Sequence, residues 1–238
     1  MKNFSILIPC YNCEKIIEKN NKKLINKVQK KKINFEIIYI NDGSTDNSYS
    51  KLRNIEIQNK KISLISYNQN LGKSAALKKG IQKSKNEILI FLDCDLPYFQ
   101  YLDKLIDKLT LGREFVFIDR RSIKSKLDKS QLNFYQILRF IISKLVNYII
   151  SKLLIKNFKG DTQSGLKGFK IDRKFKKQKF ISNKFFLDAE IMSYFSKKNV
   201  KFDSIPINYK IPKVSTIKIF DLNNFRYLLE LSKIILKF

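Results

Sequence analysis

Along the first hundred residues, short apolar runs alternate with longer polar and amphipathic stretches. The apolar runs predict buried strands at 4–9, 35–40, 62–66 and 87–93. The stretches between them predict helices, among them one from about Glu14 to Lys31 and one from Leu71 to Lys83. Strands that alternate with helices are typical of βαβ units, so we expect a parallel sheet with both faces covered. The ligand crevice of such a sheet lies along the edge where the strands end.

After Asp95 the pattern changes. It predicts a helix over 101–111, a strand over 114–118, and a long helix over 134–155, a segment that contains neither proline nor glycine. An apolar-rich segment at 220–238 predicts a C-terminal amphipathic helix. Because no linker or internal repeat is visible, we expect one α/β domain over 1–238, divided into 1–97, 98–215 and the C-terminal helix 216–238.

The long helix over 134–155 has two interpretations. Its polar residues recur every three or four positions and make a narrow stripe, which consists of Gln136, Arg139, Ser143, Asn147 and Ser151. A helix buried in the core would be apolar on most sides. A helix lying in a membrane interface would be apolar on one face with cations at the border, as Arg139, Lys144 and Lys152 allow. The basic runs on both sides favour the interfacial interpretation.

Composition excludes several classes of protein. The chain has no histidine, which excludes Ser-His-Asp and Cys-His catalysis and every histidine-ligated zinc site. Three cysteines make no disulfide framework, and 44% hydrophobic residues exclude a disordered basic tail. The short apolar run at the start is broken by Pro9 and does not resemble a signal peptide. No apolar stretch is long enough to predict a transmembrane helix.

The net charge is +27, from 48 Lys and Arg against 21 Asp and Glu. Such a charge indicates a polyanionic partner, although 41 of the cations are lysine, as in proteins from AT-rich genomes. Residues 120–180 hold 17 of the cations and only three acidic residues. Genome bias does not explain this clustering around the long apolar helix. We therefore expect an anionic membrane surface and a lipid phosphate as partners, and no nucleic acid.

Acidic residues follow two of the predicted strands. Asp93 and Asp95 are two positions apart at a strand end, so both carboxylates project to one side. Two hard oxygen ligands suit Mg²⁺ or Mn²⁺ on a diphosphate; the alternative is a solvated acidic turn. Asp42 lies in the run Asn41 to Asp46. Its carboxylate could accept a hydrogen bond from a ribose or a base. The alternative is that this run forms a helix N-cap with a tight Asp-Gly turn. Ser44 or Thr45 is the expected cap of the next helix.

Glycines and cysteines add three further candidates. The segment Asn70 to Ser74 lacks the first glycine of a P-loop, but Gly72 permits close backbone approach to a phosphate, with Lys73 as counter-charge. The Cys10-x-x-Cys13 spacing is not followed by the elements of a thioredoxin-like redox site, which favours another interpretation of this segment. The segment 161–169, with Gln163 and Ser164, is either a hydrogen-bonding insert or a connecting loop.

Taken in order, these motifs resemble the inverting family 2 glycosyltransferases with the GT-A fold, and most closely the polyprenyl- and dolichyl-phosphate glucosyl- or mannosyltransferases. The matching segments are Ile8-Pro-Cys-Tyr-Asn12, Ile40-Asn-Asp-Gly-Ser-Thr-Asp46, 70–80, Leu92-Asp-Cys-Asp-Leu96, Asp161-Thr-Gln-Ser-Gly-Leu-Lys-Gly-Phe169, 186–191 and 205–209. The stretch 161–169 selects the subgroup, because it is similar to the D-T-Q-C-G-F-K of dolichyl-phosphate glucosyltransferases. The sequence departs from the family at Cys13, where Glu is usual, and at Pro97, where a further ligand is often found.

The resemblance implies a role for each matching residue. In the nucleotide-sugar-binding half, 1–97, the implied donor-site residues are Pro9, Tyr11, Asp42, Gly72 and Lys73, with Asp93 and Asp95 as ligands of a divalent metal, Mg²⁺ or Mn²⁺. In the acceptor-binding half, 98–215, the implied acceptor-site residues are Arg120, Arg139, Ser143, Gln163, Ser164 and Lys210. The implied catalytic residues are Asp93, Asp95 and Arg120.

The implied reaction is metal-assisted transfer of a hexose, with inversion, from UDP-glucose or GDP-mannose to a polyprenyl phosphate, at the cytoplasmic face of a membrane to which the enzyme binds peripherally. The alternative is a family 2 enzyme that adds a sugar to a glycan hydroxyl in cell-surface polysaccharide synthesis. A hydroxyl acceptor needs a general base, for which Asp188 or Glu190 is available, whereas a phosphate is already anionic. The absence of histidine and the clustered cations favour the phosphate.

Overall fold

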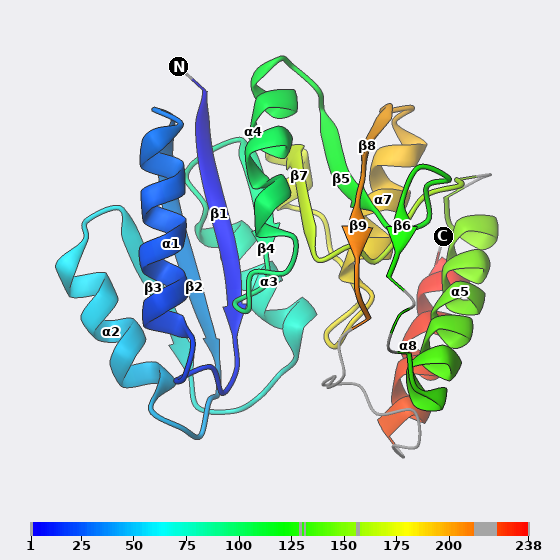
Figure 1. Cartoon of the computed structure of the whole chain (residues 1–238), viewed down its shortest axis with the longest axis horizontal. Helices are drawn as coiled ribbons and strands as arrows, with labels where there is room; N and C mark the ends of the chain where they lie inside the picture. Colours follow the sequence, from blue (N-terminus) through cyan, green and yellow to red (C-terminus); the bar gives the residue numbers. More distant parts are fainter. Residues whose placement is uncertain (1, 129, 131, 156–157, 212–222, 238) are drawn as a thin grey trace.

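The computed structural model describes residues 2–237 except 129, 131, 156–157 and 212–222 (Figure 1). Among them, seven strands form one sheet in the order β3-β2-β1-β4-β7-β5-β8, and β6 pairs with β9. The strands are β1 (Asn3–Cys10), β2 (Asn34–Asp42), β3 (Ile62–Tyr67), β4 (Ile88–Leu92), β5 (Phe115–Asp119), β6 (Lys126–Leu127), β7 (Leu166–Lys170), β8 (Phe202–Pro206) and β9 (Asn208–Tyr209). The predicted α/β class with a mostly parallel sheet is confirmed.

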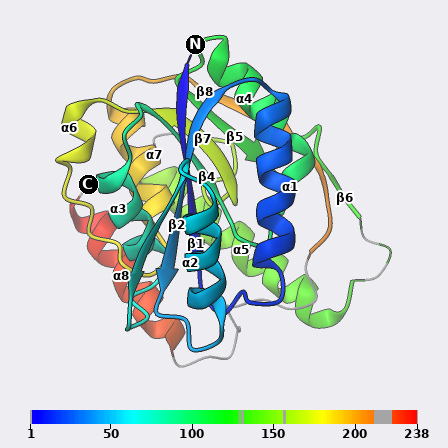
Figure 2. The same cartoon turned by 90° about the vertical axis from the view of Figure 1, so that its left-hand side faces the viewer.

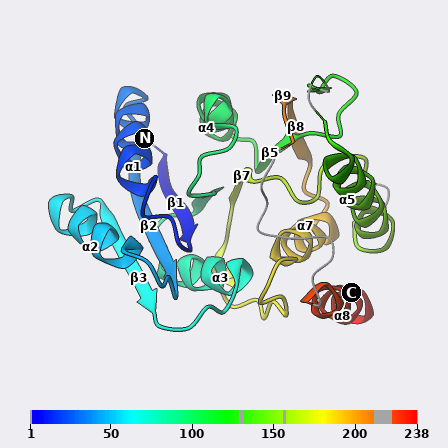
Figure 3. The same ribbon diagram turned by 60° about the horizontal axis from the view of Figure 1, so that its bottom comes forward.

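Helices cover both faces of the sheet, as Figures 2 and 3 show. They are α1 (Ile17–Lys30), α2 (Ser48–Gln58), α3 (Lys73–Lys83), η1 (Phe99–Tyr101), α4 (Leu102–Thr110), α5 (Phe134–Leu153), α6 (Arg173–Lys176), α7 (Leu187–Lys197) and α8 (Asn223–Lys237). Successive side chains of a strand point to opposite faces of the sheet. In β1, Ile6 and Ile8 belong to the core with α1 and α4, whereas Leu7 belongs to the core with α3 and α7. Burial on both faces explains why the strands are continuous apolar runs.

The sequence pattern did not predict β6, β7, β8 or β9 as strands, and β7 is the most central of these. It runs antiparallel between β4 and β5, in the middle of the sheet. Its sequence, Leu-Lys-Gly-Phe-Lys, lacks a strand-like apolar run because two special contacts are built into it. The Lys167 ammonium is buried 3.0 Å from a carboxylate oxygen of Asp188. A Cβ on Gly168 would lie 2.5 Å from Leu109 of α4, so only glycine lets α4 approach this closely.

Several helices begin later than their patterns predict. α3 begins at Lys73, not at Leu71, because Asp42 binds the two preceding amides and Gly72 has a φ of +105°. The predicted cap by Ser44 or Thr45 is wrong: α2 begins at Ser48, whose amide donates to Asp46 at 2.9 Å. For the C-terminal prediction, α8 covers 223–237, and positions 220–222 and 238 lie outside the described residues.

The helix α5 turns its narrow polar stripe toward the protein and its apolar side outward. Within the stripe, Gln136 donates to the carbonyl of Ile211 and Asn147 accepts from the amide of Thr162. The exposed large apolar residues of α5 are Phe134, Ile137, Ile141, Ile142, Leu145, Tyr148 and Leu153. A helix buried in the core is therefore the wrong interpretation of this segment. In the part of the chain that the structure describes, no helix meets the length and hydropathy needed to span a bilayer.

Candidate functional site

Asp42 joins the end of β2 to the loop before α3 at the carboxyl edge of the sheet. Asp42, at the end of β2, is buried, and its two carboxylate oxygens each accept an amide, from Leu71 and from Gly72, at 2.9 Å. This leaves the Asp42 side chain holding the loop before α3 in place. It thereby fixes the backbone at Gly72, next to the N-terminus of α3.

Tyr11 lies in the loop after β1, next to the loop after β2. The Asn12 amide donates to the Ser44 hydroxyl at 3.0 Å, and the Thr45 amide donates to the Asn12 side chain at 2.9 Å. These bonds hold the Tyr11 ring on the outside, 47% exposed, while Pro9 is half-buried in β1. An exposed aromatic ring beside a fixed polar loop is suited to stacking on a base.

Lys73 and Asp93 form an ion pair across the same edge. The Lys73 ammonium lies 2.5 Å from one Asp93 oxygen. Burial lowers the pKa of Lys73, but the charge of Asp93 outweighs it and the pKa is raised, so Lys73 is cationic. The neighbouring Asp95 is exposed as a residue, yet desolvation of its carboxyl and the charge of Asp93 raise its pKa. The structure thus concentrates two negative charges at the end of β4 with one ammonium to balance them.

The donor set fits the divalent metal that the sequence predicts. Both carboxylates offer hard oxygen ligands. Burial and the charge of Asp93 raise the pKa of Asp95, and a bound cation would stabilise its ionised form. Gly165 lies against them, and a Cβ there would sit 2.8 Å from the second Asp93 oxygen. Asp93 and Asp95 would hold Mg²⁺ or Mn²⁺, which would supply charge neutralisation to a diphosphate bound at this edge.

Gly165→Ala is therefore expected to displace the Asp93 carboxylate, because the added methyl group would overlap its oxygen. We expect the affinity for Mn²⁺ to fall by about tenfold, as for loss of a supporting contact at a metal site. Calorimetric titration with Mn²⁺ measures this directly. An unchanged melting temperature would separate the effect from unfolding, and unchanged Mn²⁺ affinity would contradict the assignment.

On the other side of β7, Arg120 is held by Asp161. The guanidinium makes a two-pronged contact with the carboxylate, and it also donates to the Gln163 carbonyl at 3.1 Å. Asp161 is buried, which raises its pKa, but the charge and hydrogen bonds of Arg120 prevail and lower it. Burial lowers the pKa of Arg120, but the charge of Asp161 outweighs this, and the net pKa of Arg120 is raised. Both members of the pair are therefore ionised.

Arg121 is a candidate residue that the sequence did not single out. Its guanidinium donates to the Ser143 hydroxyl of α5 at 2.6 Å, whereas the sequence paired Ser143 with Arg139. Two buried donors nearby, Arg121 Nε and Gln163 Nε2, have no hydrogen-bond partner among the described residues. Unsatisfied buried donors are costly, so this region is suited to an anionic group that accepts from them. The only sequence signal was the second arginine of the Arg120-Arg121 pair.

The remaining predicted acceptor-site residues have contacts within the protein. Ser164 is buried and its hydroxyl donates to the Leu166 carbonyl. Lys210 forms an ion pair with Asp128 at 2.9 Å and its side chain is 80% exposed. Arg139 lies half-buried on α5. The structure places Arg120 against the Gln163 carbonyl and the neighbouring Arg121 against Ser143. The acceptor roles of all six predicted residues stay predictions.

The two candidate bases are both engaged. Both carboxylate oxygens of Glu190 accept backbone amides, from Ile181 and Ser182, at 2.8 Å. Asp188 faces the buried Lys167 ammonium. Glu190 is thereby a structural residue that holds the segment before α7, and Asp188 balances a buried charge.

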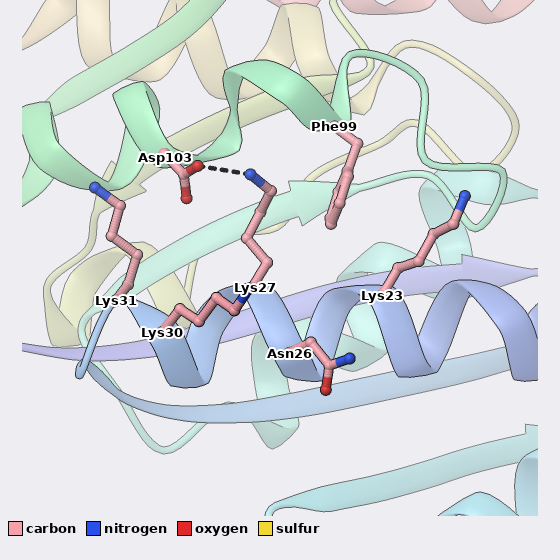
Figure 4. Close-up of a pocket in the computed structure, with 7 residues that line it drawn as sticks. All are labelled: Lys23, Asn26, Lys27, Lys30, Lys31, Phe99 and Asp103. Carbon is pink, nitrogen blue, oxygen red and sulfur yellow. Dashed lines mark hydrogen bonds and ion pairs between the residues drawn. The ribbon is translucent and has the colours of Figure 1, made fainter.

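A separate groove of about 580 Å³ lies between α1 and α4 and contains none of the predicted site residues (Figure 4). The Lys27 ammonium spans it to Asp103 at 2.6 Å, and the same ammonium lies over the Phe99 ring. Lysines of α1 line one wall. Its position on the helical face separates it from the carboxyl edge of the sheet.

A sheet of this order with carboxylates at the ends of β2 and β4 is the arrangement of a nucleotide-sugar-binding GT-A fold. The chain matches the glycosyl transferase family 2 model over residues 5–200 and belongs to that family. It aligns over 98% of its length with a glucosyl-3-phosphoglycerate synthase from Mycobacterium tuberculosis, crystallised with Mn²⁺, UDP and phosphoglyceric acid. That alignment covers 78% of the synthase, with a TM-score of 0.66 and 17% identity. At this identity the likeness shows the fold alone.

Two curated relatives illustrate the range of similarity. A dolichyl-phosphate β-glucosyltransferase from Trichomonas vaginalis is 25% identical over 228 residues, 90% of this chain and 68% of that protein. An uncharacterised glycosyltransferase from Synechocystis is 35% identical over 121 residues, which are 50% of this chain and 37% of that protein. The alignments with the latter and with two Bacillus subtilis relatives cover less than two fifths of those proteins' length.

Proposed function

We propose that this family 2 glycosyltransferase transfers a hexose from a nucleotide sugar to a polyprenyl phosphate, with inversion. The observation that carries the proposal is the position of α5. The polar stripe of α5 faces the proposed acceptor site, where the Ser143 hydroxyl accepts a hydrogen bond from Arg121. The apolar side of α5 is exposed. One helix therefore joins a surface suited to a bilayer with a cationic cluster suited to a lipid phosphate.

The donor half of the site is suited to a nucleoside diphosphate sugar. Tyr11 would stack on the base, and the Gly72 backbone with Lys73 would face the diphosphate. Asp93 and Asp95 would hold the divalent metal that neutralises the departing nucleoside diphosphate. Lys73, already cationic, would move from Asp93 to the leaving phosphate as negative charge develops there.

The acceptor half favours a phosphate over a hydroxyl. A phosphate oxygen is anionic at neutral pH and attacks the anomeric carbon without losing a proton, so it needs cations and not a base. Arg121 Nε and Gln163 Nε2, which have no hydrogen-bond partner among the described residues, would bind it, and Arg120 is held against the Gln163 carbonyl. The carboxylates of Glu190 and Asp188 are engaged elsewhere, which disfavours proton abstraction from a sugar hydroxyl.

The test is transfer from radiolabelled UDP-glucose and GDP-mannose to a polyprenyl phosphate in Mn²⁺, followed by extraction into organic solvent. We expect label in the lipid phase with one of the two donors, UDP-glucose first. Label in a glycan acceptor but none in lipid would overturn the proposal in favour of a hydroxyl-directed transferase.

The same proposal places the protein at an anionic membrane surface, through α5. Replacing Ile141 and Leu145, 56% and 58% exposed, by Glu adds two anions to the apolar face and is expected to abolish sedimentation with anionic liposomes at low salt. The control is Ile57→Glu, at an isoleucine of α2 that is 68% exposed. The helix α2 lies at the other end of the sheet from α5 (Figure 1). Equal binding by both variants, or none by the unaltered protein, would contradict this role of α5.

A further inference from the structure

All three cysteines of the chain lie together at the carboxyl ends of β1 and β4. Cys10 ends β1, Cys13 lies in the loop before α1, and Cys94 lies between the two acidic residues that follow β4. Their sulfur atoms are all within 4.8 Å of one another. Cys10 and Cys13 are buried, and Cys94 is partly exposed. The sequence had shown only a weak Cys-x-x-Cys pair, because the third thiol comes from a distant strand.

We propose that Cys10, Cys13 and Cys94 form a second metal site, for a soft d¹⁰ cation such as Zn²⁺, distinct from the carboxylate site beside it. Thiolates select soft ions, whereas carboxylates select Mg²⁺ and Mn²⁺, so the two neighbouring sites discriminate by ligand chemistry. Each thiol that binds the ion releases its proton to solvent. A water molecule would supply the fourth ligand of a tetrahedral ion held by three thiolates.

The distances require little movement. Zinc–sulfur bonds of about 2.3 Å in a tetrahedral site put sulfur atoms about 3.8 Å apart. From the present spacing, each sulfur needs to move by less than about 1 Å, which side-chain rotation supplies.

The backbone around the thiols is already fixed. The Cys13 amide donates to the Ser48 hydroxyl at 2.7 Å, and its carbonyl accepts the amides of Ile16 and Ile17. The Cys94 carbonyl accepts from the Asn20 side chain of α1 at 2.8 Å. Two of the ligands are therefore positioned by hydrogen bonds that do not involve the sulfur atoms, as in preformed metal sites. A bound ion would tie the segment 93–95 to the loop that carries Tyr11.

The test is titration of the reduced full-length protein with Cd²⁺, followed in the ultraviolet by the thiolate-to-cadmium charge-transfer band. We expect saturation at one ion per chain, displacement by Zn²⁺, and protection of all three thiols from a thiol reagent. Cys13→Ser should lose the band. Asp95→Asn should keep it while losing Mn²⁺ affinity, which separates the two sites and does not depend on sugar transfer.

Four results would overturn the proposal: no band in the unaltered protein, a band that Cys13→Ser retains, a band that Asp95→Asn abolishes, or two thiols already joined as a disulfide. Cys10→Ala serves as a second ligand deletion if Cys13→Ser does not fold. If neither variant folds, the Cd²⁺ stoichiometry of the unaltered chain is the test: one ion per chain supports the site, and no saturable binding contradicts it.

Discussion

Asp95→Asn is expected to lower the rate of sugar transfer by about 10²–10³-fold, the size of effect seen when one group that stabilises transition-state charge is removed. The amide keeps the shape of the side chain but removes the negative charge. Burial and the charge of Asp93 raise the pKa of Asp95, so a bound cation would stabilise the carboxylate. Initial rates at saturating Mn²⁺ and donor measure the loss. Because Asp95 is exposed and outside the core, the melting temperature should stay within a few degrees of the unaltered protein.

The matched control for Asp95→Asn is Asp103→Asn. It makes the same change at the α1–α4 groove, where Asp103 pairs with Lys27. Surface ion pairs contribute little, so we expect nearly unaltered transfer. Full turnover by Asp95→Asn, or an equal loss in both variants, would remove the metal role of Asp95.

The largest expected effect on stability comes from Asp161→Ala. The substitution removes the buried carboxylate that pairs with the Arg120 guanidinium. Breaking such a pair costs about 3–5 kcal/mol, and we expect about 3 kcal/mol because the Arg120 side chain is 28% exposed. Urea unfolding measures the change in the free energy of unfolding. Removing both partners, as Arg120→Met with Asp161→Leu, should recover most of it, and a double variant as unstable as Asp161→Ala would contradict the ion-pair explanation.

The same pair predicts a dependence of stability on pH. The pKa of Asp161 is lowered in the folded protein, so its carboxylate contributes stability above the unfolded-state pKa, about 3.9. That contribution is lost as the pH falls through the lower folded-state pKa. The unaltered protein should therefore lose stability below about pH 4 more steeply than Asp161→Ala does. Parallel acid-unfolding curves in the two proteins would contradict this.

The order of the elements and one half of the site were predictable because they depend on local pattern. Continuous apolar runs marked β1 to β5, since buried parallel strands need no polar face. Asp42, Gly72 and Asp93 follow from the rule that parallel strands end at one edge. The sequence placed Lys73 and Asp93 at the same diphosphate site, but it did not predict their ion pair, nor that Asp42 holds the backbone at Gly72.

The acceptor half was less predictable because its residues depend on distant partners. Lys167 resembles a surface residue until Asp188 is placed beside it, and for that reason β7 resembled a loop. Arg121 carried no signal of its own, since its contact with Ser143 joins segments 22 residues apart. The direction of α5 was ambiguous for the same reason: its stripe is polar whether it meets water or the protein.

The antiparallel strand β7 also constrains how the chain reaches its folded state. β4 has β1 on one side, but its other partner is not synthesised until residues 166–170 follow. Until then β4 is an open edge of apolar residues, the kind of edge on which nascent chains associate wrongly. The segments 1–97 and 98–215 are thus interdependent for folding. We therefore expect the first half, expressed alone, to need a chaperone to stay dispersed.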